Sequence, residues 1–219
     1  MIETDKRGSL IVISGPSGAG KGTVIKKLME MNDNIWLSVS CTSRPIRSND
    51  VEGETYYFLT KEQFEEKIKN DEFLEYAEYN GNYYGTPKAK IKEKLDNGID
   101  VILEIEVQGA LYIKKHFKDA IFIFIMPPSM EELRDRLIAR NTDSKDKILS
   151  RFKTAYNEIN EINKYNYVVV NDEVDKAALK VNSILISEKC RADRIEEVYV
   201  ANKEELIHEL LIDKEFINE

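Results

Sequence analysis

Short apolar runs alternate with stretches of helical periodicity along most of the chain. Five runs are apolar enough to be strands buried on both faces of a sheet, and they lie at residues 9–14, 35–40, 101–105, 120–126 and 167–170. The helical patterns lie at about residues 23–31, 108–117, 130–140, 147–163 and 174–190. Strands that alternate with helices predict an α/β fold, in which a mostly parallel sheet forms the middle of three layers.

Residues 43–96 have a different pattern. This segment is rich in tyrosine and carries short β-like runs at residues 56–59 and 73–79. Asn80-Gly81 is a hairpin-turn signal, and a helical pattern at residues 88–95 closes the segment. The segment predicts a small α+β lobe inserted into the main fold.

The inserted lobe divides the core along the chain. We expect one core made of residues 1–42 and 97–190, followed by a charged C-terminal extension at residues 191–219. The extension has a helical pattern near residues 204–211, for which a solvated terminal helix is the simplest interpretation.

Composition and charge exclude several classes of protein. The chain has 219 residues, of which 42% are apolar and 33% charged, as in ordinary globular proteins. A net charge of −8 argues against a general nucleic-acid binder, and two cysteines, Cys41 and Cys190, imply no disulfide framework. The sequence has no apolar run as long as a membrane span and no signal-peptide pattern, so we expect a cytoplasmic protein without membrane or nucleic-acid partners.

A glycine-rich segment connects the first apolar run to the first helical pattern. Its residues are Gly15, Pro16, Ser17, Gly18, Ala19, Gly20, Lys21, Gly22 and Thr23. Glycines let backbone N–H groups turn inward around a polyphosphate, Lys21 can reach the terminal phosphates, and the following helix directs its positive end at the same anion. A plain strand-to-helix turn is the alternative. The context favours a phosphate-binding loop for a nucleoside triphosphate.

The loop departs from the common pattern at Gly22, where a Ser or Thr hydroxyl usually ligates Mg²⁺. Because Mg²⁺ keeps much of its water, the missing hydroxyl does not exclude the metal. We expect the nucleotide phosphates and waters to hold Mg²⁺, with Thr23 and Glu104 as further candidates. Glu104 and Glu106 end the third apolar run, where open sheets place their ligands, so one can face the metal and the other a second substrate.

Two groups of arginines are candidates for anion binding. Arg44 and Arg47 follow the second apolar run, close in sequence to many tyrosines whose hydroxyls can bond a phosphate. Arg136, Arg140 and Arg151 flank a polar stretch that predicts a mobile lid at about residues 136–151, where positive charge would stabilise a transferred phosphoryl group. The alternative is that the tyrosines pack the lobe and the arginines pair with surface carboxylates.

Several segments in the same order resemble the guanylate kinases of bacterial type. They are residues 15–23, 38–44, 53–58, 82–86, 104–109 and 170–172, within a similarity that spans about residues 10–188. The resemblance implies a P-loop nucleoside monophosphate kinase that transfers the γ-phosphoryl group of ATP to GMP, and to dGMP, with Mg²⁺, in purine nucleotide metabolism. It also makes the inserted lobe the GMP-binding lobe.

The resemblance assigns roles to residues of this chain. It implies that Lys21, Arg44, Arg136, Arg140 and Arg151 are catalytic and that Asn171 contacts the adenine side of ATP. The implied GMP site consists of Ser40, Arg44, Arg47, Tyr56, Glu75, Tyr84, Thr86, Glu104 and Glu106. A carboxylate such as Glu75 can accept bonds from both N1–H and the N2 amino group of guanine, whereas adenine lacks that pair of donors.

Some positions differ from the family's pattern. Gly22 replaces the common hydroxyl, Glu106 stands where Asp is usual, Asn141 replaces a lid glycine, and the tail after about Cys190 is longer. Two rival functions remain open: a non-catalytic module that binds acidic or phosphorylated peptides, and a kinase with another acceptor such as AMP or a sugar phosphate. The sequence also leaves open whether the protein is a monomer or a homodimer.

Overall fold

The computed structural model describes residues 7–47, 50–79, 81–139 and 145–192. The chain divides into two compact units, one of residues 7–182 and one of residues 1–6 with 183–219. Both sheets and the described residues of the candidate site lie in the first unit. The predicted helix near residues 204–211 lies outside the described residues. Within the described ranges, no helix is both long and apolar enough to span a membrane.

The main sheet has five strands in the order β2-β7-β1-β8-β9, all parallel. Its strands are β1 (Leu10–Ser14), β2 (Ile35–Leu37), β7 (Asp100–Glu104), β8 (Ile121–Met126) and β9 (Tyr167–Val170). Each strand overlaps one of the five apolar runs, and every residue of β1 is buried. The α/β fold predicted from the sequence is confirmed. Because the strands are parallel, all their carboxyl ends meet at one edge of the sheet.

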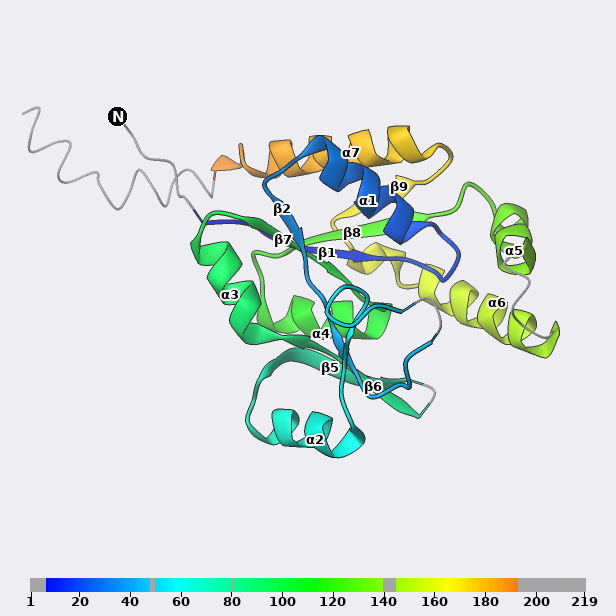
Figure 1. Cartoon of the computed structure of the whole chain (residues 1–219). Coiled ribbons are helices and arrows are strands. Elements are labelled where there is room, and N and C mark those ends of the chain that lie inside the picture. Colours follow the sequence, from blue (N-terminus) through cyan, green and yellow to red (C-terminus); the bar gives the residue numbers. More distant parts are fainter. Residues whose placement is uncertain (1–6, 48–49, 80, 140–144, 193–219) are drawn as a thin grey trace, which may run out of the picture. The chain divides into compact units, whose positions relative to one another are not determined.

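Helices cover both faces of this sheet, as the sequence predicts. In Figure 1, α1 and the first part of α7 lie on one face and α4 lies on the other. Outside the inserted lobe, the described helices are α1 (Lys21–Met31), α4 (Val107–His116), α5 (Met130–Ala139), α6 (Lys145–Ile159) and α7 (Val174–Glu188). Beneath α4, Val12, Leu103 and Phe122 of the sheet pack in one buried cluster with Ala110 and Ile113. Burying each such large side chain contributes about 1.5–3 kcal/mol.

A second, mixed sheet forms the inserted lobe in the order β4-β3-β6-β5. Its strands are β3 (Cys41–Thr42), β4 (Tyr57–Phe58), β5 (Phe73–Tyr79) and β6 (Asn82–Pro87), with helices α2 (Lys61–Lys69) and α3 (Lys88–Asp96). Phe64 of α2 is fully buried and stacks on Phe73 at 4.4 Å and on Tyr83 at 5.2 Å between ring centroids. These rings give the lobe a small core of its own.

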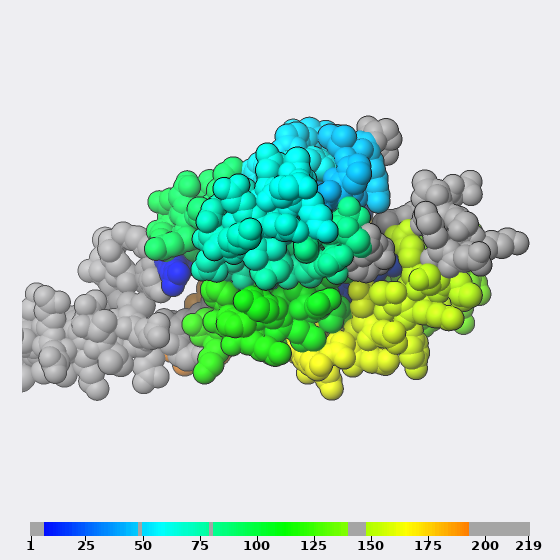
Figure 2. All heavy atoms as spheres, turned by 90° about the horizontal axis from the view of Figure 1, so that it is seen from below, coloured from blue at the N-terminus to red at the C-terminus, as the bar shows by residue number. Residues whose placement is uncertain are grey.

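The lobe is joined to the main core through α4. Leu74 of β5 and Ile91 of α3 belong to the same buried cluster as Ala110 of α4. Figure 2 shows this face, with the cyan lobe directly against the green segment that contains α4. The contact fixes the lobe next to the carboxyl ends of the strands β1 and β7, where α1 and α4 begin.

Candidate active site

The glycine-rich loop has a backbone that other residues would strain. Gly15, Gly18 and Gly20 have φ angles of 149°, 95° and 86°, in the region that favours glycine. A Cβ atom at Gly15 would lie 2.1 Å from the carbonyl oxygen of Ile125. Lys21 opens α1, and its ammonium donates to the carbonyl oxygen of Gly15 at 2.6 Å. The loop and its lysine therefore have the compact arrangement that the sequence predicts for a phosphate cradle.

Asn171 ties the end of β9 to this loop. Its side chain is only 3% exposed, and its amide nitrogen donates to the carbonyl oxygen of Ala19 at 2.8 Å. A Cβ atom at Gly20 would lie 2.4 Å from the same nitrogen, so a side chain there would displace the Asn171 amide from the loop. The resemblance implies that Asn171 contacts the adenine side of ATP, and that role stays a prediction; the described bond joins its amide to the loop backbone.

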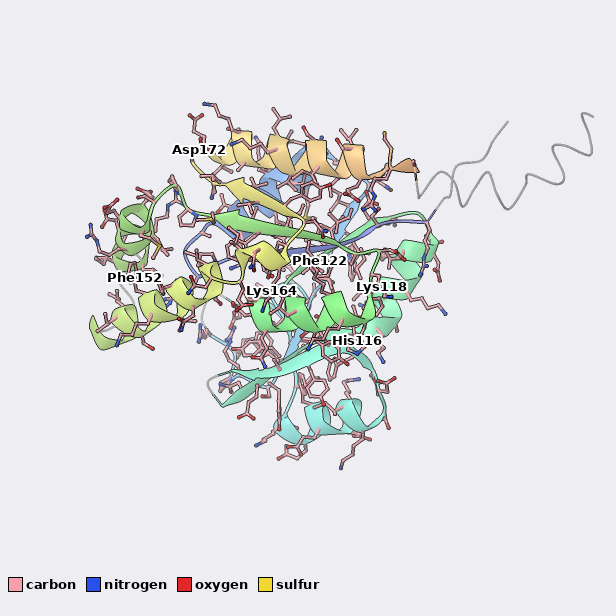
Figure 3. All side chains as sticks on the ribbon, turned by 180° about the vertical axis from the view of Figure 1, so that it is seen from behind. His116, Lys118, Phe122, Phe152, Lys164 and Asp172 are labelled. Carbon is pink, nitrogen blue, oxygen red and sulfur yellow. The ribbon has the colours of Figure 1, made fainter. Side chains whose placement is uncertain are left out.

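A cavity of about 400 Å³ lies beside the loop. Its walls come from the loop, α1, α5 and the segment after β9, and they are Gly18, Gly20, Thr23, Arg136, Ala139, Asn171, Asp172 and Val174. Figure 3 shows Asp172 after β9, on the side of the sheet where α5 lies. The volume of this cavity falls within the range of small-molecule sites, and Gly18 and Gly20 of the loop form part of its wall.

Two of the predicted lid arginines reach the loop. Arg136 of α5 donates to the carbonyl oxygens of Ala19 at 3.5 Å and Asn171 at 3.2 Å, and pairs with Glu132 at 2.9 Å. Arg151 of α6 donates to the hydroxyl of Ser17 at 2.5 Å. The structure thus brings cationic groups from two helices to the phosphate-binding loop. The remaining lid residues, Arg140 and Asn141, lie outside the described residues.

Glu75 and Thr86 form a buried polar pair in the lobe. They face each other across β5 and β6, and the Thr86 hydroxyl donates to the Glu75 carboxylate at 2.6 Å. Glu75 is 6% exposed, and this burial raises the pKa of its carboxyl group, while the Thr86 bond opposes the rise. Ser40 lies half-buried between β2 and β3, and its backbone oxygen accepts from the N–H of Tyr57. The Glu75 carboxylate can accept hydrogen bonds from a ligand that presents neighbouring N–H donors.

Arg44 lies at the predicted phosphate subsite, beside two aromatic rings. Its guanidinium carbon is 5.2 Å from the centroid of Tyr56, whose ring is 5.9 Å from that of Tyr84. Burial, followed by Tyr84, raises the pKa of Tyr56, and the charges of Glu104 and Glu106 add to the rise. Tyr56 therefore lies close enough to the carboxyl end of β7 for the charges of Glu104 and Glu106 to act on it.

Asp50 is a partner that sequence reasoning missed. It accepts two bonds from the guanidinium of Arg44, at 2.6 Å and 3.0 Å, and one from the backbone N–H of Arg47 at 2.7 Å. The Arg47 side chain is exposed. An acidic residue three positions after a second arginine was the only sequence signal for this pairing.

Acidic side chains gather around Lys21 at the end of β7. Glu104 is exposed at the end of β7, yet partial desolvation by its neighbours raises the pKa of its carboxyl group; Lys21 opposes the rise, and Glu106 adds to it. Glu158 of α6, which the sequence did not indicate, shares a hydrogen bond with Glu106. Burial and the Glu106 carboxylate raise the pKa of Glu158 to about 8. Among the described residues, no group of three His, Cys, Asp or Glu side chains is placed to hold a metal ion.

His116 takes no part in the contacts described above. It ends α4, and its ring lies 4.3 Å from that of Tyr112 and bonds the Tyr112 backbone oxygen. In Figure 3 it lies well away from Asp172 and Phe152. The other histidine, His208, lies outside the described residues.

Comparison with known proteins identifies the family. The family model described as "Guanylate kinase" matches residues 7–188. The chain belongs to the guanylate kinase family. It is 57% identical to the guanylate kinase of Clostridium tetani over 95% of this chain and 100% of that protein. It is 55% identical to the guanylate kinase of Clostridium acetobutylicum over 95% of this chain and 99% of that protein.

A solved structure gives the same family. The crystal structure of guanylate kinase from Anaplasma phagocytophilum matches with a TM-score of 0.75 and 35% identity, covering 90% of this chain and 96% of that chain. Membership in the guanylate kinase family makes the chain an enzyme of the nucleoside monophosphate kinase class. The resemblance read from the sequence is confirmed.

Proposed function

We propose that this guanylate kinase family member transfers the γ-phosphoryl group of ATP to GMP, with Mg²⁺, in purine nucleotide metabolism. The observation that carries the proposal is the buried Glu75–Thr86 pair in the lobe. Tyr84, two residues before Thr86 on β6, packs on the ring of Tyr56, which lies under the guanidinium of Arg44. This arrangement suits a guanine base at one end and a phosphate at the other. We expect dGMP to be a second acceptor, because its base presents the same edge.

Guanine recognition rests on the burial of Glu75. A carboxylate that is 6% exposed needs hydrogen-bond donors, and guanine offers N1–H and the N2 amino group side by side. Adenine would leave that carboxylate without those donors, and sites built in this way discriminate by several orders of magnitude. Ser40 lies between β2 of the main sheet and β3 of the lobe, and it is the remaining candidate contact to the base.

The phosphate of GMP would bind at Arg44. Guanidinium groups bind phosphate oxygens through paired, charge-assisted bonds, and the Tyr56 and Tyr84 hydroxyls can add neutral ones. At present, the carboxylate of Asp50 holds the guanidinium. A bound phosphate and Asp50 would both accept bonds from Arg44. When no GMP is bound, Asp50 alone keeps the guanidinium oriented. Arg47 is exposed three residues further along the chain and is the second cation available there.

ATP would bind at the glycine-rich loop. The backbone N–H groups of the loop and the positive end of α1 would bind the β- and γ-phosphates, and the adenosine would enter the cavity lined by Asn171 and Asp172. Lys21 would leave the carbonyl oxygen of Gly15 to bind the transferring group. Arg136 and Arg151, already at the loop, would stabilise the charge that develops on it.

Positioning and electrostatics account for this reaction without a covalent intermediate. Magnesium, when bound, neutralises charge on the nucleotide phosphates. The residues present fit a metal held mainly by those phosphates and by water, because Gly22 supplies no hydroxyl and the acidic side chain beside it is Glu104. Thr23 lines the adenosine cavity.

A panel of acceptors tests the proposal. ADP release is measured with ATP and Mg²⁺ against GMP, dGMP, AMP, CMP and a sugar phosphate, and then with Mg²⁺ removed by chelation. We expect turnover with GMP and dGMP, and none without the metal. Turnover with AMP or the sugar phosphate in preference to GMP would support the kinase with another acceptor. Absence of all turnover, with binding of acidic peptides, would support the non-catalytic module.

A further inference from the structure

Gly109 has no backbone reason to be glycine. It is the third residue of α4, it is buried, and its φ angle is not in the left-handed region. Alanine is preferred to glycine at such helical positions. The reason for glycine must therefore lie in the space around its α-carbon.

That space is occupied by the carboxylate of Glu75. A Cβ atom at Gly109 would lie 2.8 Å from Oε2 of Glu75 and 3.3 Å from its carboxyl carbon. The same Cβ atom would lie 3.5 Å from Ile105, which is ordinary contact. The conflict is therefore with the end of one side chain, not with the backbone, and an added methyl group would displace the Glu75 carboxylate without disrupting the helix.

Glu75 cannot accommodate that displacement freely. Its other oxygen accepts the Thr86 hydroxyl at 2.6 Å, and the side chain is almost fully buried. The carboxylate is thus held between Thr86 on one side and the first turn of α4 on the other. Its orientation depends on both neighbours.

We propose that Gly109 is a specificity-determining positioning residue, which sets the carboxylate of Glu75 in the orientation that reads guanine. This inference rests on the proposed role of Glu75 in binding the base. A Cβ atom added at Gly109 would meet Glu75 and Ile105 first, and neither residue belongs to the phosphate-binding loop or to the lid arginines. Its effect should therefore appear in the acceptor and not in ATP.

A double-mutant cycle of Gly109→Ala and Glu75→Gln tests the inference. KM and kcat are measured for GMP, AMP and ATP in the wild type, both single variants and the double variant, with thermal unfolding as the control for folding. We expect Gly109→Ala to raise KM for GMP about tenfold, as expected for a weakened charge-assisted bond. We expect KM for ATP to be unchanged. The melting temperature should stay close to that of the wild type, because the helix gains from alanine while the displaced carboxylate opposes that gain.

In the Glu75→Gln background, Gly109→Ala should change KM for GMP less than about twofold, because coupled residues are not additive. An equal loss in both backgrounds, a parallel rise in KM for ATP, or an unchanged KM for GMP in the single variant would each overturn the inference. If Glu75→Gln itself leaves GMP selectivity unchanged, the proposed reading of guanine fails, and the role of Gly109 fails with it. If Glu75→Gln alters selectivity and Gly109→Ala does not, the role of Gly109 alone fails.

Discussion

The guanidinium of Arg44 donates two hydrogen bonds to the carboxylate of Asp50, at 2.6 Å and 3.0 Å. The two side chains are only 8% and 9% exposed, and Arg44 also donates to the backbone oxygen of Pro45 at 2.8 Å. The cation expected to bind the phosphate of GMP is thus oriented by a carboxylate before any substrate arrives.

This pair predicts a pH dependence of stability. The Arg44 bond holds the pKa of Asp50 below its usual value of 3.8. A depressed pKa contributes stability above the unfolded-state value, and that contribution is lost as pH falls through the folded-state pKa. Asp50→Asn should therefore lower the melting temperature at neutral pH, and the difference from the wild type should shrink as pH falls below 3.8. Thermal unfolding across this range provides the measurement, and a difference independent of pH would contradict the prediction.

Lys21→Met should abolish most activity and leave the fold intact. The ammonium of Lys21 bonds only loop carbonyl oxygens in the described contacts, whereas loss of a charge-stabilising donor at a reacting group costs about 2.7–4 kcal/mol. We expect kcat to fall at least about a hundredfold, with an unchanged far-UV spectrum. Lys26→Met, on the exposed side of the same helix, is the matched control. Near-normal turnover of a folded Lys21→Met protein would rule out the loop as the catalytic cradle.

Gly22→Ser should be tolerated. A Cβ atom there would lie 3.7 Å from Oε2 of Glu104, an ordinary contact, and the backbone is helical. The new hydroxyl restores a Mg²⁺ ligand, so half-maximal activity should need less Mg²⁺ than in the wild type. Titrating Mg²⁺ against activity in both proteins tests this. Complete loss of activity in the variant would show that the loop needs glycine for another reason.

Asn171→Ala should weaken ATP binding. The substitution removes the bond to the carbonyl oxygen of Ala19 that fixes the end of the loop. A buried group left without its partner costs about 1–3 kcal/mol, so KM for ATP should rise about tenfold with little change in KM for GMP. Asn163→Ala, at an exposed position of the turn Ile162–Lys164, is the control. A rise confined to KM for GMP would place Asn171 on the acceptor side instead.

Apolar continuity made the main sheet predictable, because strands buried on both faces must be apolar throughout. The second run was predicted to residue 40, yet β2 ends at Leu37. Ser38 still pairs with the backbone of Ile102, and Cys41–Thr42 then join the lobe's sheet. Sequence alone does not show where a strand leaves one sheet for another.

Other features were missed for physical reasons. Helix α2 was not predicted, although Thr60 and Gln63 form a capping box at its start. Its short amphipathic pattern was hidden in the tyrosine-rich segment. The partners Asp50 and Glu158 were missed because pairing of buried charges depends on tertiary contacts. The glycine at position 109 was visible in the sequence, but its contact with Glu75 lies 34 positions away along the chain.

The most direct test of the account is acceptor selectivity in Glu75→Gln. Glutamine keeps the shape of the side chain but presents an amide donor to the donor edge of guanine, at a cost of about 1.5–3 kcal/mol for each charge-assisted bond lost. We predict that the ratio of kcat/KM for GMP to that for AMP falls at least about tenfold, through the GMP value and with ATP binding unchanged. Glu78→Gln, exposed on the same strand, should leave the ratio as it is. An unchanged ratio in Glu75→Gln would contradict the assignment of guanine to this pocket.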